Sequence, residues 1–450
     1  MPSPKILYPL IFVFIANISC KKYLDEKPLK SQIVPSTLND LQALLDNYRN
    51  LNWQGPELLE ALSDNYFITS ATYSTHTTTD QMNYTWDKDA TDYYNWFTPY
   101  TNPIYYSNIV LDQLPKITYA TSDQPILNNI KGSALFYRSF AFYQIAQQYC
   151  KPFSSTASSD LGIVLRVTSD INVPSARSTV KETYEKIIGD LKEAINLLPL
   201  HPLYPTRPSK LAAYGALARA YISMRDYENA GLYADSLLQI NDTLIDYNTL
   251  DSTIRPVFKN YNSEIVFYSQ EQGPLVIRVN GGLVDSTLYR SYDANDLRKT
   301  FFFTDNLDGT YGFSGSYEGT SDFLPFDGIV TDEIYLIQAE CLARSGNKDA
   351  ALASLNTLLT SRWKTGSFKP FTATTSSEAL NIILSERRKE LLYRGLRWTD
   401  IRRLNLEGAG ITLTRIVNGN TYTLPPNDLR SILLIPKEVL ALTTLQQNPR

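Results

Sequence analysis

After residue 35, apolar positions recur every three or four residues through most of the chain, the spacing of an amphipathic helix. The clearest case lies between Thr179 and Leu198, where apolar side chains share one face and Pro199 ends the pattern. Two stretches, 69–91 and 152–175, are polar or irregular and are predicted to be loops. The pattern predicts helices over about 36–45 (with Ser36 as its cap), 56–67, 93–114, 126–149 and 179–198.

Two later segments match each other as an internal repeat. When 210–240 is aligned with 331–360, Tyr and Ala positions coincide at one constant offset. They resemble defined positions of a tetratricopeptide repeat, where small residues let two antiparallel helices approach closely. The alternative is generic helix packing that uses alanine. The coincident pairs are Tyr214 with Tyr335, Ala218 with Ala339, Tyr221 with Leu342, and Ala230 with Ala351.

The segment 247–327 interrupts the helical pattern and is rich in Gly, Asn, Asp, Ser and aromatic residues. Short apolar or alternating runs at 265–268 and 275–278 predict a few brief strands among loops. A further β signal lies near the C-terminal end, where apolar or alternating residues flank Asn418-Gly419-Asn420, a strong hairpin turn sequence. The sequence therefore predicts a mainly α protein with a loop-rich, partly β region.

The first twenty residues have the features of an export signal. Lys5 supplies a positive charge, and the apolar run 6–16 is too short to span a bilayer. Ile18-Ser19-Cys20 resembles a bacterial lipoprotein cleavage site, which predicts removal of the signal peptide 1–19 and acylation of Cys20. The polar stretch that follows, 20–35, is predicted to be a tether. The alternative is an ordinary signal peptide followed by a coincidental cysteine.

Composition narrows the possible function classes. The formal net charge of −4 gives no basic excess for nucleic acid, and two His residues are too few for a zinc site built on several histidines. Cys150 and Cys341 are predicted to be free and buried, with a disulfide between them as the alternative. The 31 Tyr residues suit sugar-binding surfaces as well as helix interfaces, because Tyr combines a flat apolar face with a polar tip.

The charged stretch 385–403 contains the one carboxylate pair that suggests catalysis. Glu386 and Glu390 stand four apart on one helix face, and so do Glu390 and Arg394. Paired carboxylates can hydrolyse glycosides, but the nearby arginines would keep both ionised, whereas a general acid must carry a proton. We therefore predict a structural ion-pair network in this stretch.

No other catalytic or metal signature is complete. The sequence lacks a Gly-rich phosphate loop, a nucleophile elbow and an HExxH motif. The run 305–309, Asp-Asn-Leu-Asp-Gly, is a fragment of a calcium loop, for which a plain turn is the alternative. Asp296 and Arg298 are expected to pair structurally. We expect a protein that is not an enzyme and that uses no metal and no cofactor.

Five separated segments together resemble the SusD/RagB family. The stretch 386–403 is the most specific of them, and the set follows the family's order along the chain. Two positions depart from the family pattern, with Cys150 in place of a usual Gly and Arg394 in place of a usual Glu. The segments are Cys20 to Pro28 with Leu24; Trp96 to Leu114 with Tyr100, Ile104 and Asn108; Arg138 to Tyr143 followed by Tyr149 and Pro152; Glu386 to Arg403 with Gly395, Arg397, Trp398 and Asp400; and Leu434 to Pro436 followed by Glu438, Asn448 and Pro449.

The resemblance implies one domain over 36–450. It would hold tetratricopeptide-like helical repeats at about 126–240 and 331–403 and a ligand-facing, loop-rich region at about 247–327. It also implies a surface-exposed protein, lipid-anchored to the outer membrane, that closes a SusC-like TonB-dependent β-barrel as its lid. The implied ligand is an oligosaccharide, and a peptide, as in some RagB-like members, is the alternative.

Ligand binding is expected in two loop segments that combine flat rings with hydrogen-bonding side chains, because sugars expose CH faces and hydroxyl edges. One segment runs from Tyr73 to Trp86 and the other from Tyr289 to Tyr317. Two other classes stay open: a helical-repeat surface scaffold, which would not need these loops, and an exported hydrolase, whose nucleophile or acid pair is missing. The candidate ligand-binding residues are Tyr73, Tyr84, Trp86, Tyr292, Tyr311 and Tyr317.

Overall fold

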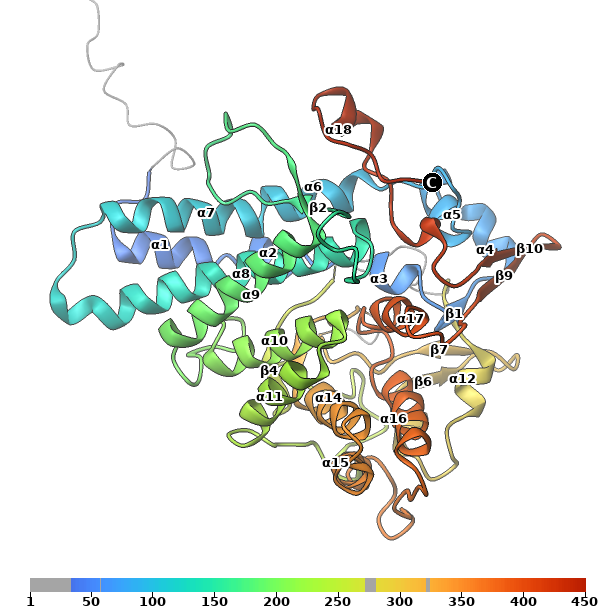
Figure 1. Cartoon of the computed structure of the whole chain (residues 1–450). Coiled ribbons are helices and arrows are strands. Elements are labelled where there is room, and N and C mark those ends of the chain that lie inside the picture. Colours follow the sequence, from blue (N-terminus) through green and yellow to red (C-terminus); the bar gives the residue numbers. More distant parts are fainter. Residues whose placement is uncertain (1–33, 57, 272–280, 321–323) are drawn as a thin grey trace, which may run out of the picture.

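The computed structural model describes residues 34–56, 58–271, 281–320 and 324–450. Most of this chain is helical, with a loop-rich region packed beside the helices (Figure 1). The predicted signal peptide, Cys20 and nearly all of the tether lie outside the described residues, as does the predicted strand at 275–278. Among the helices of the described part, none combines the length and apolarity needed to cross a membrane.

A stack of antiparallel helices forms the first half of the fold. The longest, α8 (Gln124–Tyr149), packs against α7 (Pro103–Gln113) and α9 (Val180–Leu197). Helix α9 begins with a capping box, in which the side chains of Thr179 and Glu182 each accept a hydrogen bond from the other's backbone. The predicted helices over 126–149 and 179–198 are therefore confirmed.

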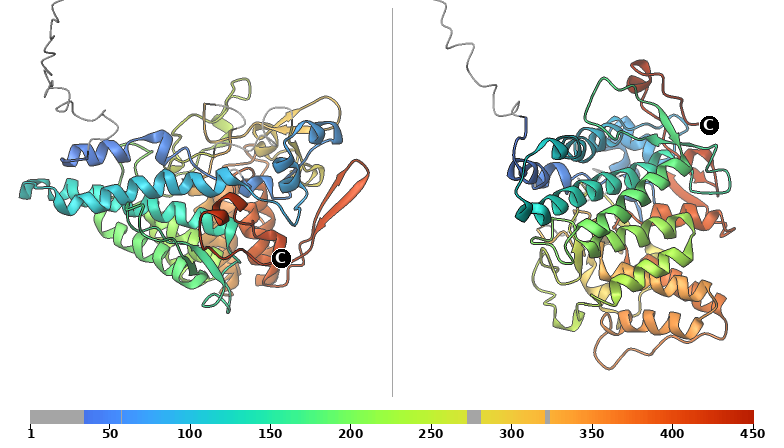
Figure 2. Two further views of the ribbon diagram at one scale, coloured as in Figure 1. Left: turned by 90° about the horizontal axis from the view of Figure 1, so that it is seen from above. Right: turned by 60° about the vertical axis from the view of Figure 1, so that its left-hand side comes forward.

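The two predicted repeat segments each form a helix hairpin, α10 with α11 and α14 with α15. The two hairpins are joined by the packing of α11 on α14, and α16 packs on another side of α14 (Figure 2). Close packing excludes side chains at some positions: a Cβ on Gly215 would lie 2.3 Å from Ile329 Cγ2. The expectation of tetratricopeptide-like hairpins is confirmed. Their bounds are α10 (Lys210–Met224), α11 (Tyr227–Leu238), α14 (Thr331–Arg344), α15 (Lys348–Thr360) and α16 (Ser376–Glu390).

The prediction of a loop over 69–91 is wrong. This stretch contains α4 (Ser70–Thr75) and α5 (Thr78–Tyr84). Thr69 and Thr77 cap these helices by accepting hydrogen bonds from backbone N–H groups three residues on. Both helices are short and polar, so an apolar period could not reveal them.

Three other predicted helices differ in extent. The segment 93–114 forms two helices, α6 (Tyr93–Thr101) and α7, because the chain turns at Asn102 before a proline. Of the segment 56–67, the described residues are helical in α3 (Leu58–Ala61), after which comes β1 (Tyr66–Phe67). Helix α1 (Leu38–Leu45) is capped by Thr37 rather than by Ser36.

Short antiparallel strand pairs cross the loop-rich region and its surroundings. The predicted C-terminal hairpin is confirmed as β9 and β10. Asn418 and Gly419 have φ angles of 50° and 75°, the left-handed values that a two-residue type I′ turn requires. The paired strands are β1 with β5 (Leu283–Val284), β2 (Leu161–Val164) with β3 (Arg177–Thr179), β4 (Ile265–Phe267) with β8 (Ile329–Val330), β6 (Phe303–Asp305) with β7 (Tyr311–Phe313), and β9 (Leu413–Val417) with β10 (Asn420–Leu424).

The core has a large apolar part along the helix stack, a strongly aromatic part under the loop-rich region, and a third part among α14, α15 and α16. Cys150 and Cys341 are both buried and free, as predicted. The remaining elements are short. They are α2 (Tyr48–Leu51), η3 (Leu114–Lys116), η4 (Thr121–Asp123), η5 (Tyr247–Thr249), α12 (Ser286–Arg290), α13 (Leu297–Phe301), α17 (Arg397–Asn405), η6 (Leu429–Ser431) and α18 (Lys437–Ala441).

Candidate functional site

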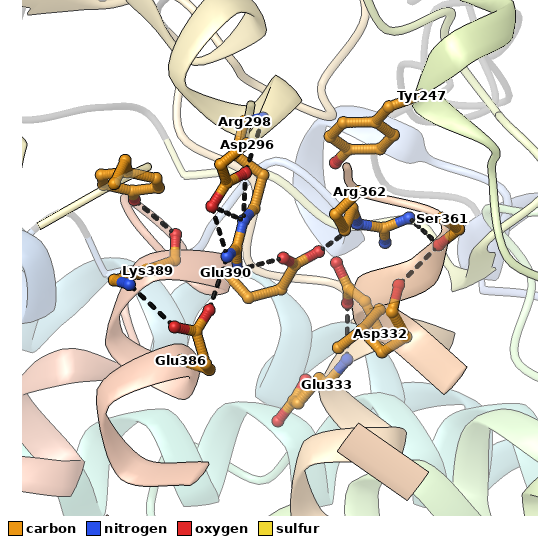
Figure 3. Close-up of polar contacts among 12 residues, drawn as sticks. Tyr247, Asp296, Arg298, Asp332, Glu333, Ser361, Arg362, Glu386, Lys389 and Glu390 are labelled. Atoms are coloured by element: carbon orange, nitrogen blue, oxygen red, sulfur yellow. Dashed lines mark hydrogen bonds and ion pairs between the residues drawn. The ribbon is translucent and has the colours of Figure 1, made fainter. Parts of the chain in front are cut away.

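The carboxylates that could suggest a glycosidase belong to a buried ion network (Figure 3). Arg298 donates to Asp296 at 2.7 Å, to Glu386 at 2.5 Å and to Glu390 at 2.9 Å, and its side chain is fully buried. Arg362 binds Glu390 from the other side at 2.7 Å. The predicted network and the predicted Asp296–Arg298 pair are both confirmed.

Neither glutamate of this network is suited to act as an acid. Burial alone would raise the pKa of Glu390, but Arg362 and Arg298 outweigh it, so the pKa is lowered. The pKa of Glu386 is lowered in the same way, by Arg298 and Lys389 against the effect of burial. Both groups are therefore ionised at neutral pH and act as ion-pair partners of the buried arginines.

The predicted pairing of Glu390 with Arg394 is wrong. Helix α16 ends at Glu390, and Tyr393 and Gly395 take positive φ angles of 57° and 66°, so one helix does not run through 385–403. The turn carries Arg394 to Asp332, which it binds at 3.2 Å. Spacing on a helix predicts a contact only while the helix continues.

Four of the six candidate ligand-binding rings lie in the interior. Tyr84 and Trp86 flank the guanidinium of Arg415, which lies 3.9 and 4.4 Å from their ring centres. The hydroxyl of Tyr292 donates to Lys389 O at 2.8 Å, and that of Tyr317 donates to Glu264 at 2.8 Å. Each of the four rings is at most 2% exposed, so none can stack on a ligand in this conformation.

The other two candidates, Tyr73 and Tyr311, are half-buried at the edge of the aromatic core. Tyr311 stacks on Tyr289 with ring centres 3.5 Å apart, and Lys299 Nζ lies 4.8 Å from the centre of Tyr289. Burial and the neighbouring Tyr311 raise the pKa of Tyr289 to about 12, so its phenol stays protonated at neutral pH. We call Tyr73, Tyr289, Tyr311, Phe313 and Tyr422, all half-buried on this core, the loop-face rings. The ligand-binding role of the candidate residues stays a prediction.

A second aromatic surface, which the sequence analysis did not select, lines a hollow of about 510 Å³ along α6 and α7. Tyr93 and Phe97 stack there with ring centres 5.3 Å apart, and about half of each side chain is exposed. The opposite wall is the segment 165–176, which is fixed to α7 because Asp112 accepts hydrogen bonds from Ser169 at 2.7 Å. The i, i+4 spacing of Tyr93 and Phe97 was the available signal, but helical spacing does not tell a buried face from an exposed one. We call this hollow the α6–α7 groove.

The possible calcium fragment at 305–309 forms the turn between β6 and β7. Asp305 and Asp308 each accept a hydrogen bond from a backbone N–H two residues on, which fixes the turn. Within the described ranges, no group of three or more His, Cys, Asp or Glu residues could hold a metal ion. The observed geometry is that of a plain turn.

Segments that resembled a known family at separate places in the sequence meet in the structure. Arg138 of α8 donates to Asn108 of α7 at 2.9 Å and to Asp190 of α9 at 2.7 Å, so one guanidinium joins three helices. Asp400 and Arg403 of α17 pair at 2.8 Å, and Arg403 continues to Glu340 of α14 at 2.6 Å. Buried ion pairs of this kind fix how helices lie against each other.

Comparison with known proteins agrees with this architecture. A family model described as "Starch-binding associating with outer membrane" matches residues 22–222, and a model described as "SusD family" matches 332–431. SusD-like protein P2 of Formosa agariphila is 24% identical over 351 residues, which are 63% of this chain and 66% of that protein. The alignment thus spans just under two thirds of the relative's length.

Two solved structures share the fold over nearly their whole length. A SusD superfamily protein from Bacteroides thetaiotaomicron has a TM-score of 0.73 at 20% identity, covering 92% of this chain and 100% of the other. A SusD-like carbohydrate binding protein from Bacteroides vulgatus has a TM-score of 0.70 at 19% identity, covering 91% and 97%. With the two family models and the helical-repeat architecture, these matches show that the chain belongs to the SusD/RagB family.

Proposed function

We propose that this protein binds an oligosaccharide at the cell surface and delivers it to a SusC-like TonB-dependent outer-membrane barrel, which it closes as a lid. Acylated Cys20 would hold it in the outer membrane. Support comes from the family match, whose description names starch binding and association with the outer membrane. The Bacteroides vulgatus protein of the same fold is named as carbohydrate binding.

The observation that carries the sugar proposal is the set of loop-face rings. The stacked Tyr289–Tyr311 pair is partly accessible, and Lys299 supplies a donor beside it. A pyranose ring can lay its CH face on such a plate while its hydroxyls bond to the phenols and the ammonium. Because the ionised Glu386 and Glu390 cannot supply an acid, the proposed role is capture without covalent chemistry.

Isothermal titration calorimetry with neutral and charged oligosaccharides tests this proposal. Tyr311→Ala removes half of the stacked plate and should weaken binding by about tenfold, since an aromatic contact contributes about 1 kcal/mol or more. Tyr119→Ala, a 39% exposed tyrosine between η3 and η4, is the matched control and should bind like the unchanged protein. Equal binding by both variants would refute the loop-face site.

A peptide is the second candidate ligand, and the α6–α7 groove is the observation that favours it. Its exposed apolar walls, with Tyr93 and Phe97, suit apolar peptide side chains as well as sugar faces. Peptide pools belong in the same titrations. Binding of peptides and not of sugars, lost on Phe97→Ala and kept on Tyr311→Ala, would replace the sugar proposal.

The partner is tested by pulling the native acylated protein from outer membranes in mild detergent and identifying co-purifying proteins by mass spectrometry. A TonB-dependent barrel at equal stoichiometry is expected. Cys20→Ser should remove the lipid anchor and release the protein from the membrane fraction. Recovery of the protein alone, or with a soluble enzyme, would exclude the lid role and favour the scaffold or hydrolase reading.

A further inference from the structure

A pocket of about 360 Å³ is lined by residues of α12, α16 and α17. Figure 1 shows these three helices to the right of the α10–α11 and α14–α15 hairpins. Three guanidinium groups line the pocket, and Asp400 is the one acidic residue among its lining residues. We call it the arginine pocket. Its polar lining is Arg387, Arg388, Arg397, Asp400, Thr287, Ser291 and Ser385.

Two of the carboxylates around the pocket are each shared between two guanidinium groups. Asp400 binds Arg387 at 2.9 Å and also Arg403 outside the pocket at 2.8 Å. Asp64 is divided between Arg397 at 2.7 Å and Arg388 at 3.3 Å. The next acid, Asp285, lies 3.9 Å from Arg388 and is occupied in capping α12. Among the lining residues themselves three guanidinium groups face one carboxylate, and the acids that offset the remaining charge, Asp64 and Asp285, lie outside the pocket lining.

One of these arginines has an unused donor inside the protein. The side chain of Arg387 is 3% exposed, and its Nε is bound to Asp400, but its Nη1 is buried and has no hydrogen-bond partner. A buried guanidinium N–H without an acceptor costs more than a neutral group would, because a charged group is being desolvated. Because Nη1 is closed off from solvent, an oxyanion in the pocket would supply the missing acceptor only together with a shift of the Arg387 side chain.

The electrostatic surroundings of Arg388 also favour an anion in the pocket. Burial lowers the pKa of Arg388, and the neighbouring Arg397 lowers it further, against the opposite effect of Asp64. An anion beside Arg388 would offset both the desolvation and the like-charge repulsion. Thr287 and Ser385, both exposed, add hydroxyl donors at the rim, whereas the hydroxyl of Ser291 already donates to Leu288 O at 2.6 Å. A planar guanidinium binds carboxylate or sulfate oxygens in pairs, which makes this donor set specific for oxyanions.

The pocket adjoins the proposed sugar plate through a single helix turn. Thr287 and Leu288 of α12 line the pocket, while Tyr289 of the same helix stacks on Tyr311. A sugar chain on the loop-face rings can therefore present a substituent of a neighbouring ring to the arginines.

Resting on the proposed function, we propose that the arginine pocket binds the carboxylate or sulfate group of an anionic oligosaccharide, so that the ligand class of this protein is acidic glycans. Neutral starch-like chains would offer only hydroxyl oxygens to the pocket and no negative charge to its three guanidinium groups.

The test compares charged oligosaccharides with neutral forms of the same chains by calorimetry. Oligogalacturonate is paired with its methyl ester, and a sulfated carrageenan oligosaccharide with its desulfated form. At least one charged member should bind about tenfold tighter than its neutral partner. Arg388→Gln should remove that preference, and Arg255→Gln, an exposed arginine outside the pocket, should keep it. Ser385→Ala, at the exposed rim, weakens binding of the charged form without putting the fold at risk.

Each outcome has a defined consequence. Equal affinity for charged and neutral forms in both pairs overturns the inference, and if the shared affinity is lost on Tyr311→Ala, the proposed sugar site itself stands. Binding of inorganic sulfate alone, abolished by Arg388→Gln but without preference for acidic chains, would assign the pocket to a free anion and also overturn the inference. If the unchanged protein binds none of the sugars, the proposed function itself is refuted.

Discussion

Replacing Arg298 with methionine tests whether the buried ion network holds the loop-rich region on the helices. Arg298 belongs to α13 in the loop-rich region, and Glu386 and Glu390 belong to α16 in the helix stack. Methionine keeps much of the side-chain length and removes the charge, so Asp296, Glu386 and Glu390 lose their shared donor inside the protein.

The loss of stability expected for Arg298→Met depends on which partners the three carboxylates keep. Glu390 keeps Arg362 at 2.7 Å and Glu386 keeps Lys389 at 2.7 Å, whereas Asp296 is left without its guanidinium. Breaking a buried pair from one side costs about 3–5 kcal/mol, which is a large part of the roughly 5–15 kcal/mol that stabilises a typical domain. We expect Arg298→Met to lower the free energy of unfolding by that amount. Arg298→Lys keeps a charge but loses the fork, so its loss should be smaller.

Urea unfolding followed by circular dichroism measures these differences. Lys181→Met is the control, since its pair with Glu185 spans 3.8 Å with both side chains more than half exposed and should contribute less than about 0.5 kcal/mol. The deficit of Arg298→Met should also shrink below pH 5, because protons then neutralise the stranded carboxylates. A loss of under about 1 kcal/mol at pH 7, equal to that of the control, would refute the reasoning.

Two further predictions concern the interior. Burial raises the pKa of Glu60 from 4.5 to about 7. As the pH rises, the unfolded chain therefore loses the Glu60 proton before the folded protein does. The free energy of unfolding should fall by about 3 kcal/mol between pH 4.5 and 7 through this group alone. Glu60→Gln should flatten that slope in urea titrations at pH 5 and pH 8, and an unchanged slope would contradict the assignment. Gly215→Ala places a Cβ 2.3 Å from Ile329, so the melting temperature should fall by several degrees, whereas Gly189→Ala in α9, with open space around its Cβ, should leave it unchanged or raise it.

Much of the fold was predictable because its signals are local. The amphipathic face of α9, the small residues shared by the two repeat hairpins and the Asn418-Gly419 turn each act within a few residues. The density of charges in 385–403 predicted an ion network, but the arginines that bind Glu390 are Arg298 and Arg362, which are distant in sequence. Helices α4 and α5 escaped prediction because threonine caps and polar faces give no periodic apolar signal.

The sequence by itself determined that aromatic rings are abundant and on which segments they lie, but not which of them face solvent. Arg415, distant in sequence, lies against the buried rings of Tyr84 and Trp86, whereas Tyr311 stays half-buried at the edge of the aromatic core. The arginine pocket likewise exists only because α12 comes to lie beside α16 and α17. Burial depends on contacts between segments far apart in the chain, and only the tertiary structure brings those segments together.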